Sequence, residues 1–517
     1  MPAAPTRLAT GRRILERHGP LLAVLVAVAA LAAALHRDGL GWGDDYTLYL
    51  RQAKSLVDGN VGQVIADNHF NVANAAKPGF SPYVYPWGWP ILLAPFLRWW
   101  GLDAAKLKLV EVACLCGFLA VFHAVVRRRT GEGAGRWVAL GVVATIGTTL
   151  AYLQHTDELL SEFPYLFAVA LTLWWLDRCR RNGNGPLDVP LAVPLDQAGR
   201  NRLIVLGLLA MAVFNIRREG LAMIVAIAAT HLVESRGRWR RLDWRAVATP
   251  YVSFIVGVVA LQAMLPSALA PEYAGSGLHQ TWSKLRGSFK VAFGEQLGFD
   301  HLHGIGLVVV LALVVGGIVL RLSTHAADDI GLVVFAIVSM TIVGMIPAVA
   351  DRYLLAVTPF AVYFGAQAIA AVRLPHHAGR WAAVGALGAL TVLHVTKLPD
   401  PIRAIQHANE SGTVQDGPLS AYAQAGFDAV RHHTHESDVV AFFKARSMTY
   451  FTGRRAVQSS DLQLLRERSD FFLARRNSGF SQPLVNEAEA TAMGWVSVWS
   501  DAEWQLWRLP RLDAATP

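Results

Sequence analysis

Apolar stretches long enough to cross a lipid bilayer recur along most of this sequence. A spanning helix needs about 20 mostly apolar residues, because the hydrocarbon core of a bilayer is about 30 Å thick. The candidate segments are 20–36, 104–126, 137–153, 163–177, 203–216, 220–233, 246–265, 304–321, 330–347, 353–372 and 380–396. We therefore predict an all-α polytopic membrane protein with about 11 transmembrane helices. A further short helix is expected at 89–100.

The composition agrees with this prediction. Of the 517 residues, 53% are hydrophobic and 16% are charged, whereas a soluble domain usually carries about 25% charged residues. The three cysteines, Cys114, Cys116 and Cys179, are too few for a disulfide framework, and we expect structural roles for them. A cytosolic enzyme, a disordered chain and a disulfide scaffold are therefore poor interpretations. A secretory signal peptide is the rival interpretation of 20–36, but the many later segments favour an uncleaved span.

The basic residues predict which helix ends face the cytoplasm. The chain has 47 Lys and Arg against 38 Asp and Glu, a net charge of +9, and loops rich in basic residues stay on the cytoplasmic side. Residues 1–19 and the loops near 127–136, 178–202, 234–245, 321–329 and 373–380 carry arginines, so we place them inside. Because this topology accounts for most of the positive charge, we expect the lipid bilayer and no nucleic acid as a partner.

An odd number of spans places the C-terminal segment, 397–517, outside the cytoplasm. Its charge content is higher, and strands are expected at 438–443, 470–474, 495–499 and 504–507, with a helix at 461–468. We predict a cytoplasmic N-terminus (1–19), a transmembrane domain (20–396) with a first outer loop at about 37–88, and a small C-terminal α/β extracytoplasmic domain (397–517). The predicted location is the inner (plasma) membrane.

Acidic residues gather in two of the loops assigned to the outer face. Asp44 and Asp45 follow the first span, and a second outer loop carries Asp157, Glu158 and Glu162 without a lysine or arginine. A helix N-cap next to a residue favoured by the helix dipole would explain the first pair structurally. A solvated, capped turn would explain the second loop. Carboxylates at one membrane depth could instead supply a general base and a divalent-metal site at Asp44, Asp157 and Glu158, for Mg²⁺ or Mn²⁺.

Three arginines break the charge pattern because they lie at outer ends of spans. Arg217 and Arg218 interrupt an apolar stretch, and Arg352 opens another. The structural alternative for the first two is an ion pair with Glu219. For Arg352 it is an ion pair with Asp351 or contact with lipid headgroups. An ionisable group in such a place is a functional candidate, and the planar guanidinium suits bidentate binding of phosphate.

Aromatic residues and prolines lead into the short helix expected at 89–100. They are typical of an interfacial aromatic belt, and they could equally form the wall of a pocket for a sugar ring or an isoprenoid chain. The aromatic residues expected in a substrate pocket are Tyr46, Tyr85, Trp87, Trp89 and Tyr353.

Taken in order, these motifs resemble those of the GT-C superfamily of polytopic glycosyltransferases. The closer resemblance is to the branch of protein O-mannosyltransferases and the aminoarabinose transferase that modifies lipid A. Four segments match in order: the acidic pair 44–45, the segment 85–90 (family pattern Tyr-Pro-Pro-Gly-Tyr-Pro), the second acidic loop 161–165, and 352–359 (Arg-Tyr-Leu-Leu-Pro). Residues 217–220 are similar to an Arg-Pro-Glu-Gly segment. The sequence departs from the family at Asp45, where the family has Glu, and at Trp87, where it has Pro.

The resemblance implies a glycosyltransferase that moves a sugar from a polyprenyl-phosphate donor to an acceptor lipid, glycan or protein of the cell envelope. It implies an inverting displacement on the extracytoplasmic side, with an aspartate as general base. The residues expected to act are the base Asp44 with Asp45 orienting it, the acceptor-site or metal-site acids Asp157, Glu158 and Glu162, and the phosphate-binding Arg352, Arg217 and Arg218. The segment 397–517 resembles an outer domain that some members carry.

A transporter or flippase of a lipid-linked or anionic substrate is the alternative from a different class. Such a protein is expected to show inverted repeats and paired breaks of its spans near the bilayer midplane. The sequence shows no convincing repeat, and its acids gather outside the bilayer. A non-catalytic scaffold would leave the outer acids and arginines unexplained. The sequence therefore favours the glycosyltransferase.

Overall fold

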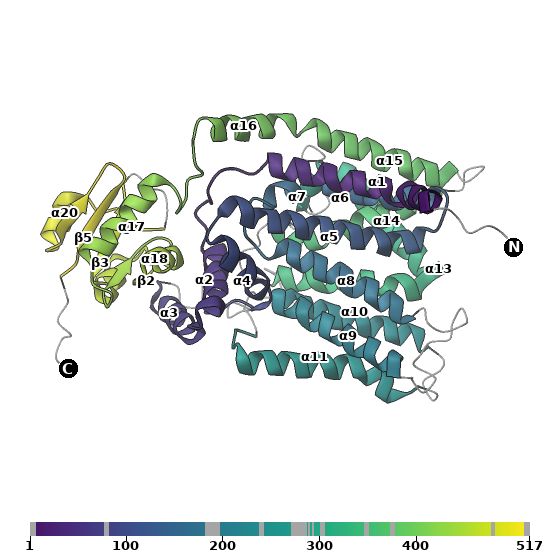
Figure 1. Cartoon of the computed structure of the whole chain (residues 1–517), viewed down its shortest axis with the longest axis horizontal. Coiled ribbons are helices and arrows are strands. Elements are labelled where there is room, and N and C mark those ends of the chain that lie inside the picture. Colours follow the sequence, from purple (N-terminus) through teal and green to yellow (C-terminus); the bar gives the residue numbers. More distant parts are fainter. Residues whose placement is uncertain are drawn as a thin grey trace.

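A bundle of long helices carries a smaller domain with a β-sheet at one end (Figure 1). This computed structural model describes residues 7–76, 82–180, 197–236, 242–269, 287, 290–291, 294–299, 305–345, 351–372, 378–476 and 481–510.

Every predicted span overlaps a helix of the bundle. The helices are α1 (Arg7–Ala34), α5 (Ala104–Thr130), α6 (Ala134–Gly147), α7 (Leu150–His155), α8 (Glu162–Arg180), α9 (Gln197–Ile216), α10 (Leu221–Glu234), α11 (Trp244–Met264), α13 (Ile305–Gly344), α14 (Thr358–Ala370) and α15 (Ala378–Thr396). Short 3₁₀ helices, η2 (Arg218–Gly220), η4 (Glu295–Leu297) and η5 (Asp351–Ala356), lie in the connections. α13 covers two predicted spans, and non-helical backbone at His325 divides it.

Five helices within the described ranges are long and apolar enough to cross a bilayer. They are α5, α9, α11, α13 and the helix that runs through α15 and α16 (Pro399–Glu410). The segment from His18 to Ala34 and α6 are shorter apolar helices. The predicted helical architecture with apolar spans is confirmed, and the number of about 11 spans stays a prediction.

Large apolar side chains lie exposed on the outside of the bundle. Val256 and Val259 on α11 are 60% and 62% exposed, and Val308 and Val319 on α13 are 64% and 62% exposed. A water-facing surface rarely carries such a belt, whereas lipid accepts it because helices satisfy their own backbone hydrogen bonds. The outer surface of the bundle therefore suits a bilayer.

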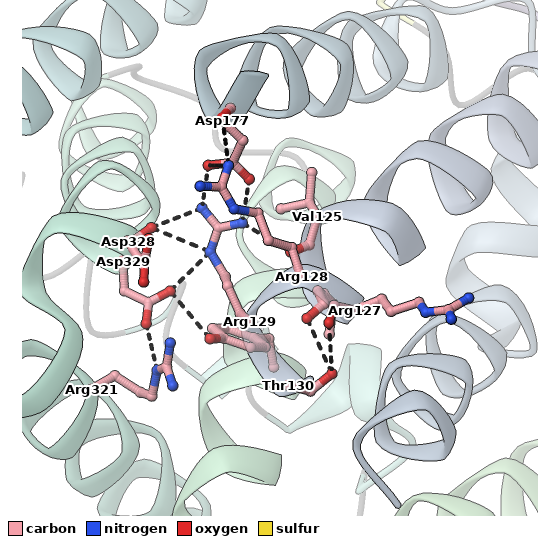
Figure 2. Close-up of polar contacts among 11 residues, drawn as sticks. Val125, Arg127, Arg128, Arg129, Thr130, Asp177, Arg321, Asp328 and Asp329 are labelled. Carbon is pink, nitrogen blue, oxygen red and sulfur yellow. Dashed lines mark hydrogen bonds and ion pairs between the residues drawn. The ribbon is translucent and has the colours of Figure 1, made fainter. Parts of the chain in front are cut away.

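A buried ion-pair network holds the end of the bundle predicted to face the cytoplasm (Figure 2). Arg129, near the end of α5, donates to both oxygens of Asp177 on α8 at 2.7 and 3.1 Å. It also donates to Asp329 on α13 at 3.0 Å, and Arg321 pairs with Asp329 at 2.5 Å. All four side chains are 8% exposed or less. The network thus joins α5, α8 and α13. Arginines that predicted the cytoplasmic side therefore also hold the helices together.

The first outer loop forms helices of its own at the other end of α1. These are α2 (Asp44–Asp58), α3 (Val61–Asn74) and the beginning of α4 (Gly88–Trp100). The N-cap of α2 is Gly43, whose position leaves both Asp44 and Asp45 in the first turn. Asp44 is therefore not the N-cap, and a purely capping role does not account for it.

The C-terminal domain is built on a five-stranded mixed sheet of order β2-β1-β3-β5-β4. β1 (Val439–Ala441) pairs in parallel with β2 (Arg455–Val457) and β3 (Phe471–Arg475), while β5 (Trp504–Arg508) pairs antiparallel with β3 and β4 (Val496–Ser500). The helices are α17 (Ala421–His433), α18 (Ala445–Thr452), α19 (Leu462–Arg468) and α20 (Glu487–Ala492). The four predicted strands and the predicted helix at 461–468 are present, and β2 is additional.

Aromatic packing fixes this domain to the first outer loop. Trp42, just before α2, lies edge-on to Phe427, Phe442, Phe443 and Trp504, with ring centroids 5.0 to 6.3 Å apart. Such contacts add to the stabilisation gained from burial alone. The C-terminal domain and the start of α2 therefore form one packed unit at one end of the bundle, on the left in Figure 1.

Candidate active site

Asp45 lies at the centre of a charged cluster where the bundle meets the C-terminal domain. Its Oδ2 accepts a hydrogen bond from Arg352 Nη2 at 2.6 Å, and its Oδ1 accepts one from the Tyr85 hydroxyl at 2.6 Å. Arg446 of α18 approaches Oδ1 to 3.9 Å. The Asp45 side chain is 33% exposed, so a substrate can reach it. Segments far apart in the sequence thus converge on one carboxylate.

Arg352 extends the cluster to the second acidic loop. Its Nε lies 3.2 Å from Glu162 Oε1, and Arg217 Nη1 lies 2.7 Å from the same oxygen. The other arm of Arg217 contacts Glu219 at 2.9 Å. Negative and positive side chains therefore alternate along a chain of ion pairs, from Asp45 through Arg352, Glu162 and Arg217 to Glu219. Each guanidinium thus lies between two acids: Arg217 donates to both of its acids, and Arg352 donates to Asp45 and forms an ion pair with Glu162.

Tyr353 supports both arginines from one side. The centre of its ring lies 4.9 Å from the guanidinium carbon of Arg217 and 5.4 Å from that of Arg352. Cation–π contacts of this kind restrict the orientation of a guanidinium group. Because Tyr353 belongs to the same 3₁₀ helix as Arg352, η5 positions an arginine and its aromatic support together.

The two neighbouring acids of α2 have opposite ionisation tendencies. Burial raises the pKa of Asp45, but the positive charge of Arg352 and the hydrogen bond from Tyr85 outweigh it, so this pKa lies below the ordinary value. Burial also raises the pKa of Asp44, and nearby Lys444 offsets only part of that rise. Asp45 is thus held ionised, while Asp44 is more easily protonated.

A cavity of about 270 Å³ opens beside the charged cluster. Its polar wall contains Asp45, Glu162, Arg217 and Arg352, and its apolar wall is formed by Val84, Pro86, Leu160, Phe214, Ile216, Leu221, Leu269 and Ile342. Leu221 and Leu269 are 45% and 57% exposed, so the apolar wall continues to the outer surface of the bundle. A cavity of this kind suits an amphipathic ligand with an anionic group.

The structure brings some of the predicted site residues together and leaves others apart. The cavity wall includes Asp45, Tyr85, Glu162, Arg217, Arg218, Arg352 and Tyr353. The predicted residues that do not belong to this wall are Asp44, Tyr46, Trp87, Trp89, Asp157 and Glu158.

Three of the predicted residues support the wall, Arg218 and Trp87 through hydrogen bonds and Trp89 through burial. Arg218 lines the cavity, but its guanidinium donates to Ser267 Oγ at 2.6 Å and to the Ala268 carbonyl at 2.8 Å. Its expected partner Glu219 instead receives a bond from Arg217. Trp87 and Trp89 are fully buried. These residues hold the segment around the cavity in place.

Tyr46 and Glu158 lie at the margins of the cluster. The Tyr46 hydroxyl donates to the Gly41 carbonyl at 2.8 Å, which ties the start of α2 to the preceding turn. Glu158 is 44% exposed and reaches Arg352 at 3.9 Å and His155 at 3.5 Å. Glu158 is therefore the most accessible acid of the second loop near Arg352.

The acids suggested for a divalent ion do not come together. Within the described ranges, no group of three or more His, Cys, Asp or Glu side chains is arranged to hold a metal ion. Asp157 pairs with buried Lys108 at 2.7 Å, and Glu158 faces Arg352. Asp44 has the cations Lys444 and Arg446 nearby. Each of these three acids thus faces a cationic side chain.

Arg446 is a member of the cluster that the motif order did not indicate. Its side chain is 2% exposed and enters the site from the C-terminal domain. No local pattern connects it with α2, because the contact exists only once the two domains pack. The one available signal is its place after Phe442, Phe443 and Ala445, where a buried charge would need a partner.

Comparisons with known proteins identify the fold. No family model matches the sequence, and no curated protein matches it. The structure of ArnT from Cupriavidus metallidurans bound to undecaprenyl phosphate matches with a TM-score of 0.53 and 11% identity, covering 96% of this chain and 98% of that one. The apo structure of the same protein matches with a TM-score of 0.53 and 12% identity, covering 97% of this chain and 98% of that one.

A second kind of membrane enzyme gives a similar result. The Archaeoglobus fulgidus oligosaccharyltransferase in a complex with Zn and sulfate matches with a TM-score of 0.50 and 11% identity, covering 87% of this chain and 68% of that one. Identities this low establish a shared fold. This chain therefore shares its fold with ArnT and with this oligosaccharyltransferase, in agreement with the architecture predicted from the order of the motifs.

Proposed function

We propose that this chain is a membrane glycosyltransferase that moves a sugar from a polyprenyl-phosphate donor to an acceptor on the extracytoplasmic face. The observation that carries the proposal is the single cavity that joins Asp45, Arg217 and Arg352 to an apolar wall. A polyprenyl phosphate has the two matching parts, an anionic group and an isoprenoid chain. The ArnT structure with the same fold contains undecaprenyl phosphate, which supports this class of donor.

Arg352 and Arg217 are the proposed ligands of the donor phosphate. Both lie within 3.2 Å of the same oxygen of Glu162, so their guanidinium groups are close enough to bind one phosphate group. Arginine donors bind phosphate strongly and with defined geometry. The leaving phosphate gains negative charge as its bond to the sugar breaks, and fixed cations at this position stabilise the transition state.

Asp45 is the proposed general base, in place of Asp44. We assign the base to Asp45 because Asp45 lines the cavity, whereas Asp44 does not. Asp45 would accept the proton of an acceptor hydroxyl while the acceptor oxygen attacks the anomeric carbon. The bond between that carbon and the phosphate oxygen breaks, and the polyprenyl phosphate leaves with the bonding electrons. Attack from the face opposite the leaving group inverts the anomeric configuration.

Donor binding would itself prepare the base. Arg352 is the closest cation to Asp45, at 2.6 Å, and a donor phosphate would compete for the same guanidinium. Once Arg352 turns to the phosphate, the pKa of Asp45 rises towards its ordinary value, because the strongest opposing charge is shared. A base with a higher pKa accepts a proton more readily.

A transfer assay with the purified protein in lipid nanodiscs tests this function. The assay follows movement of a labelled sugar from a polyprenyl-phosphate donor to envelope acceptors, at equal amounts of folded protein. Asp45→Asn should lower the turnover by roughly 10²-fold or more, within the range for general bases. Asp44→Asn makes the same chemical change one residue earlier and should cost less than about tenfold.

The two variants separate the possible outcomes of this assay. Wild-type turnover in Asp45→Asn would remove Asp45 from the reaction. A larger loss in Asp44→Asn than in Asp45→Asn would return the base to Asp44, as the order of the motifs suggested. Absence of transfer by the wild-type protein from every polyprenyl-phosphate sugar offered, in envelope extracts that contain lipid, glycan and protein acceptors, would contradict the proposed function.

A further inference from the structure

We propose that Arg446 of the C-terminal domain is a positioning residue of the active site, which acts through Tyr85 to keep Asp45 oriented and ionised while the donor phosphate occupies Arg352. This inference rests on the proposed role of Asp45 as the base. It gives the C-terminal domain a part in the chemistry.

The first step of the argument is the way in which Arg446 is held. Its Nε donates to Asn68 Oδ1 at 3.2 Å, and its Nη2 donates to the Pro82 carbonyl at 3.0 Å. Its Nη1 lies 3.5 Å from the Tyr85 hydroxyl, and its guanidinium carbon lies 5.2 Å from the centre of the Tyr85 ring. A buried guanidinium fixed at every nitrogen has one available orientation, and that orientation faces Tyr85.

The second step is the connection from Tyr85 to Asp45. The Tyr85 hydroxyl donates to Asp45 Oδ1 at 2.6 Å and receives the weaker contact from Arg446. The direct separation between Arg446 Nη1 and Asp45 Oδ1 is 3.9 Å, which is too long for a hydrogen bond. Burial raises the pKa of Tyr85 well above its ordinary value, so its hydroxyl keeps the proton that it donates. Arg446 therefore orients Asp45 through Tyr85, and its charge, 3.9 Å from Oδ1, also favours the ionised carboxylate directly.

The third step concerns the charges that remain when phosphate binds. Several titratable and charged groups face Asp45 from the elements packed around it. Those of the first outer loop and the bundle are Asp44 and Tyr49 of α2, Tyr85 before α4, Glu158 of the second acidic loop, and Arg352 and Tyr353 of η5. Those of the C-terminal domain are Lys444 and Arg446. Phosphate would draw Arg352 away from the carboxylate. Arg446, joined to Asp45 through Tyr85, then supplies the positive charge that limits protonation of the base.

The C-terminal domain has further contacts that hold it in place without Arg446. The hydroxyl groups of Thr47 on α2 and Ser447 on α18 form a buried hydrogen bond of 3.1 Å. Arg455 pairs with Asp67 of α3 at 3.1 Å, and Trp42 packs among the aromatic residues of the domain. Removal of the Arg446 guanidinium should therefore leave the domain docked and change the local field around Asp45.

The test is the pH dependence of turnover at saturating donor for wild type, Arg446→Gln and Arg446→Lys. Arg446→Gln should lower kcat by about tenfold or more, with the KM for the donor changed less than about threefold. Loss of the cation raises the pKa of Asp45, so the acid limb of the profile should move to higher pH by about one unit. Arg446→Lys keeps the charge and should keep the wild-type acid limb, with a reduced kcat because the fork geometry is lost.

Arg455→Gln provides the matched control. Arg455 also reaches from the C-terminal domain to the first outer loop, but it is 52% exposed and contacts Asp67 rather than the cluster. Its loss should leave both kcat and the pH profile at wild-type values. Thermal unfolding of all three variants in the same nanodiscs shows whether each is folded.

The outcomes distinguish this inference from the proposed function. An inactive Asp45→Asn together with a wild-type kcat and acid limb in Arg446→Gln would overturn the role of Arg446 alone. Full turnover in Asp45→Asn would overturn the base and, with it, this inference. If Arg446→Gln does not fold, Arg446→Lys decides the matter: a wild-type kcat in that variant would show that the arginine geometry is not needed.

Discussion

The position of each arginine near Asp45 decides what that arginine can do. Arg352 and Arg217 share one glutamate oxygen and face the cavity. Arg218 also lines the cavity, yet its donors are directed to Ser267 and the backbone at Ala268. Each nitrogen of Arg218 donates to an uncharged protein acceptor, whereas Arg352 and Arg217 donate chiefly to carboxylates, whose place a phosphate can take. We therefore assign the donor phosphate to the first two.

Substitution of Arg352 tests this assignment. Arg352→Ala should lower kcat/KM for the donor by about 10²-fold, because it removes charge-assisted hydrogen bonds to phosphate. Arg352→Lys keeps the charge but loses the fork, so its loss should be smaller, about tenfold. Arg218→Lys serves as the comparison and should cost less than Arg352→Lys. Wild-type kcat/KM in both Arg352 variants would exclude phosphate binding at this residue.

Residue-level reasoning from the sequence indicated the loops that form the charged cluster but could not choose within them. The acidic pair, Arg217 and Arg352 were identified because charges at span ends are unusual in an apolar chain. Which member of the pair faces the cavity depends on the rotation of α2, and α2 packs against both α4 and α18. Successive helix residues differ by about 100° in direction, so Asp44 and Asp45 enter different surroundings.

The ion pairs at the C-terminal end of α5 hold this helix against its neighbours and take no part in the proposed reaction. α5 has 27 residues, so its ends are about 40 Å apart. Lys108 and Asp157 meet near its beginning, and Arg129 meets Asp177 near its end. The network in Figure 2 is therefore remote from the cavity. Its role is to join α5, α8 and α13.

Asp177→Asn should destabilise the protein without changing the site. It leaves Arg129, which is 4% exposed, without its bidentate partner, and breaking a buried pair costs about 3–5 kcal/mol. Because Asp329 still contacts Arg129, we expect the free energy of unfolding in denaturant to fall by about 3 kcal/mol, the lower end of that range. Turnover per folded molecule should be unchanged.

The exposed pair of Asp400 and Arg403 offers a control for that measurement. These side chains are 90% and 73% exposed, and surface pairs contribute about 0–1 kcal/mol. Asp400→Asn should therefore have little effect on the free energy of unfolding. If Asp177→Asn unfolds at the same denaturant concentration as Asp400→Asn, the network does not hold the three helices.

Elements were predictable to the extent that their own residues specify them. Each apolar segment overlaps a helix because a backbone in lipid must satisfy its own hydrogen bonds. The loop expected between the two spans of α13 is mostly helical, with a break at His325. β2 has three residues, too few to show an alternating pattern, and it exists because β1 pairs with it. Its formation depends on a partner strand that local sequence does not reveal.

At the scale of the whole molecule, the active site proposed here lies between two structural units. The bundle contributes Glu162, Arg217 and Arg352, the first outer loop contributes Asp45, and the C-terminal domain contributes Arg446. The sequence indicated a boundary at 397, but α16 continues the preceding helix to Glu410 before the domain begins. Hydropathy predicted two units, and it could not show that a buried arginine of one reaches into the other.

A structure of the protein with a polyprenyl phosphate bound in nanodiscs tests the central claim most directly. We expect the phosphate within hydrogen-bond distance of Arg352 and Arg217, the isoprenoid chain along the apolar wall near Leu221 and Leu269, and the Asp45 carboxylate beside the phosphate where an anomeric carbon would stand. Asp45 should have lost its contact with Arg352 and kept that with Tyr85. A phosphate bound away from both arginines, or a lipid that leaves this cavity empty, would contradict the account.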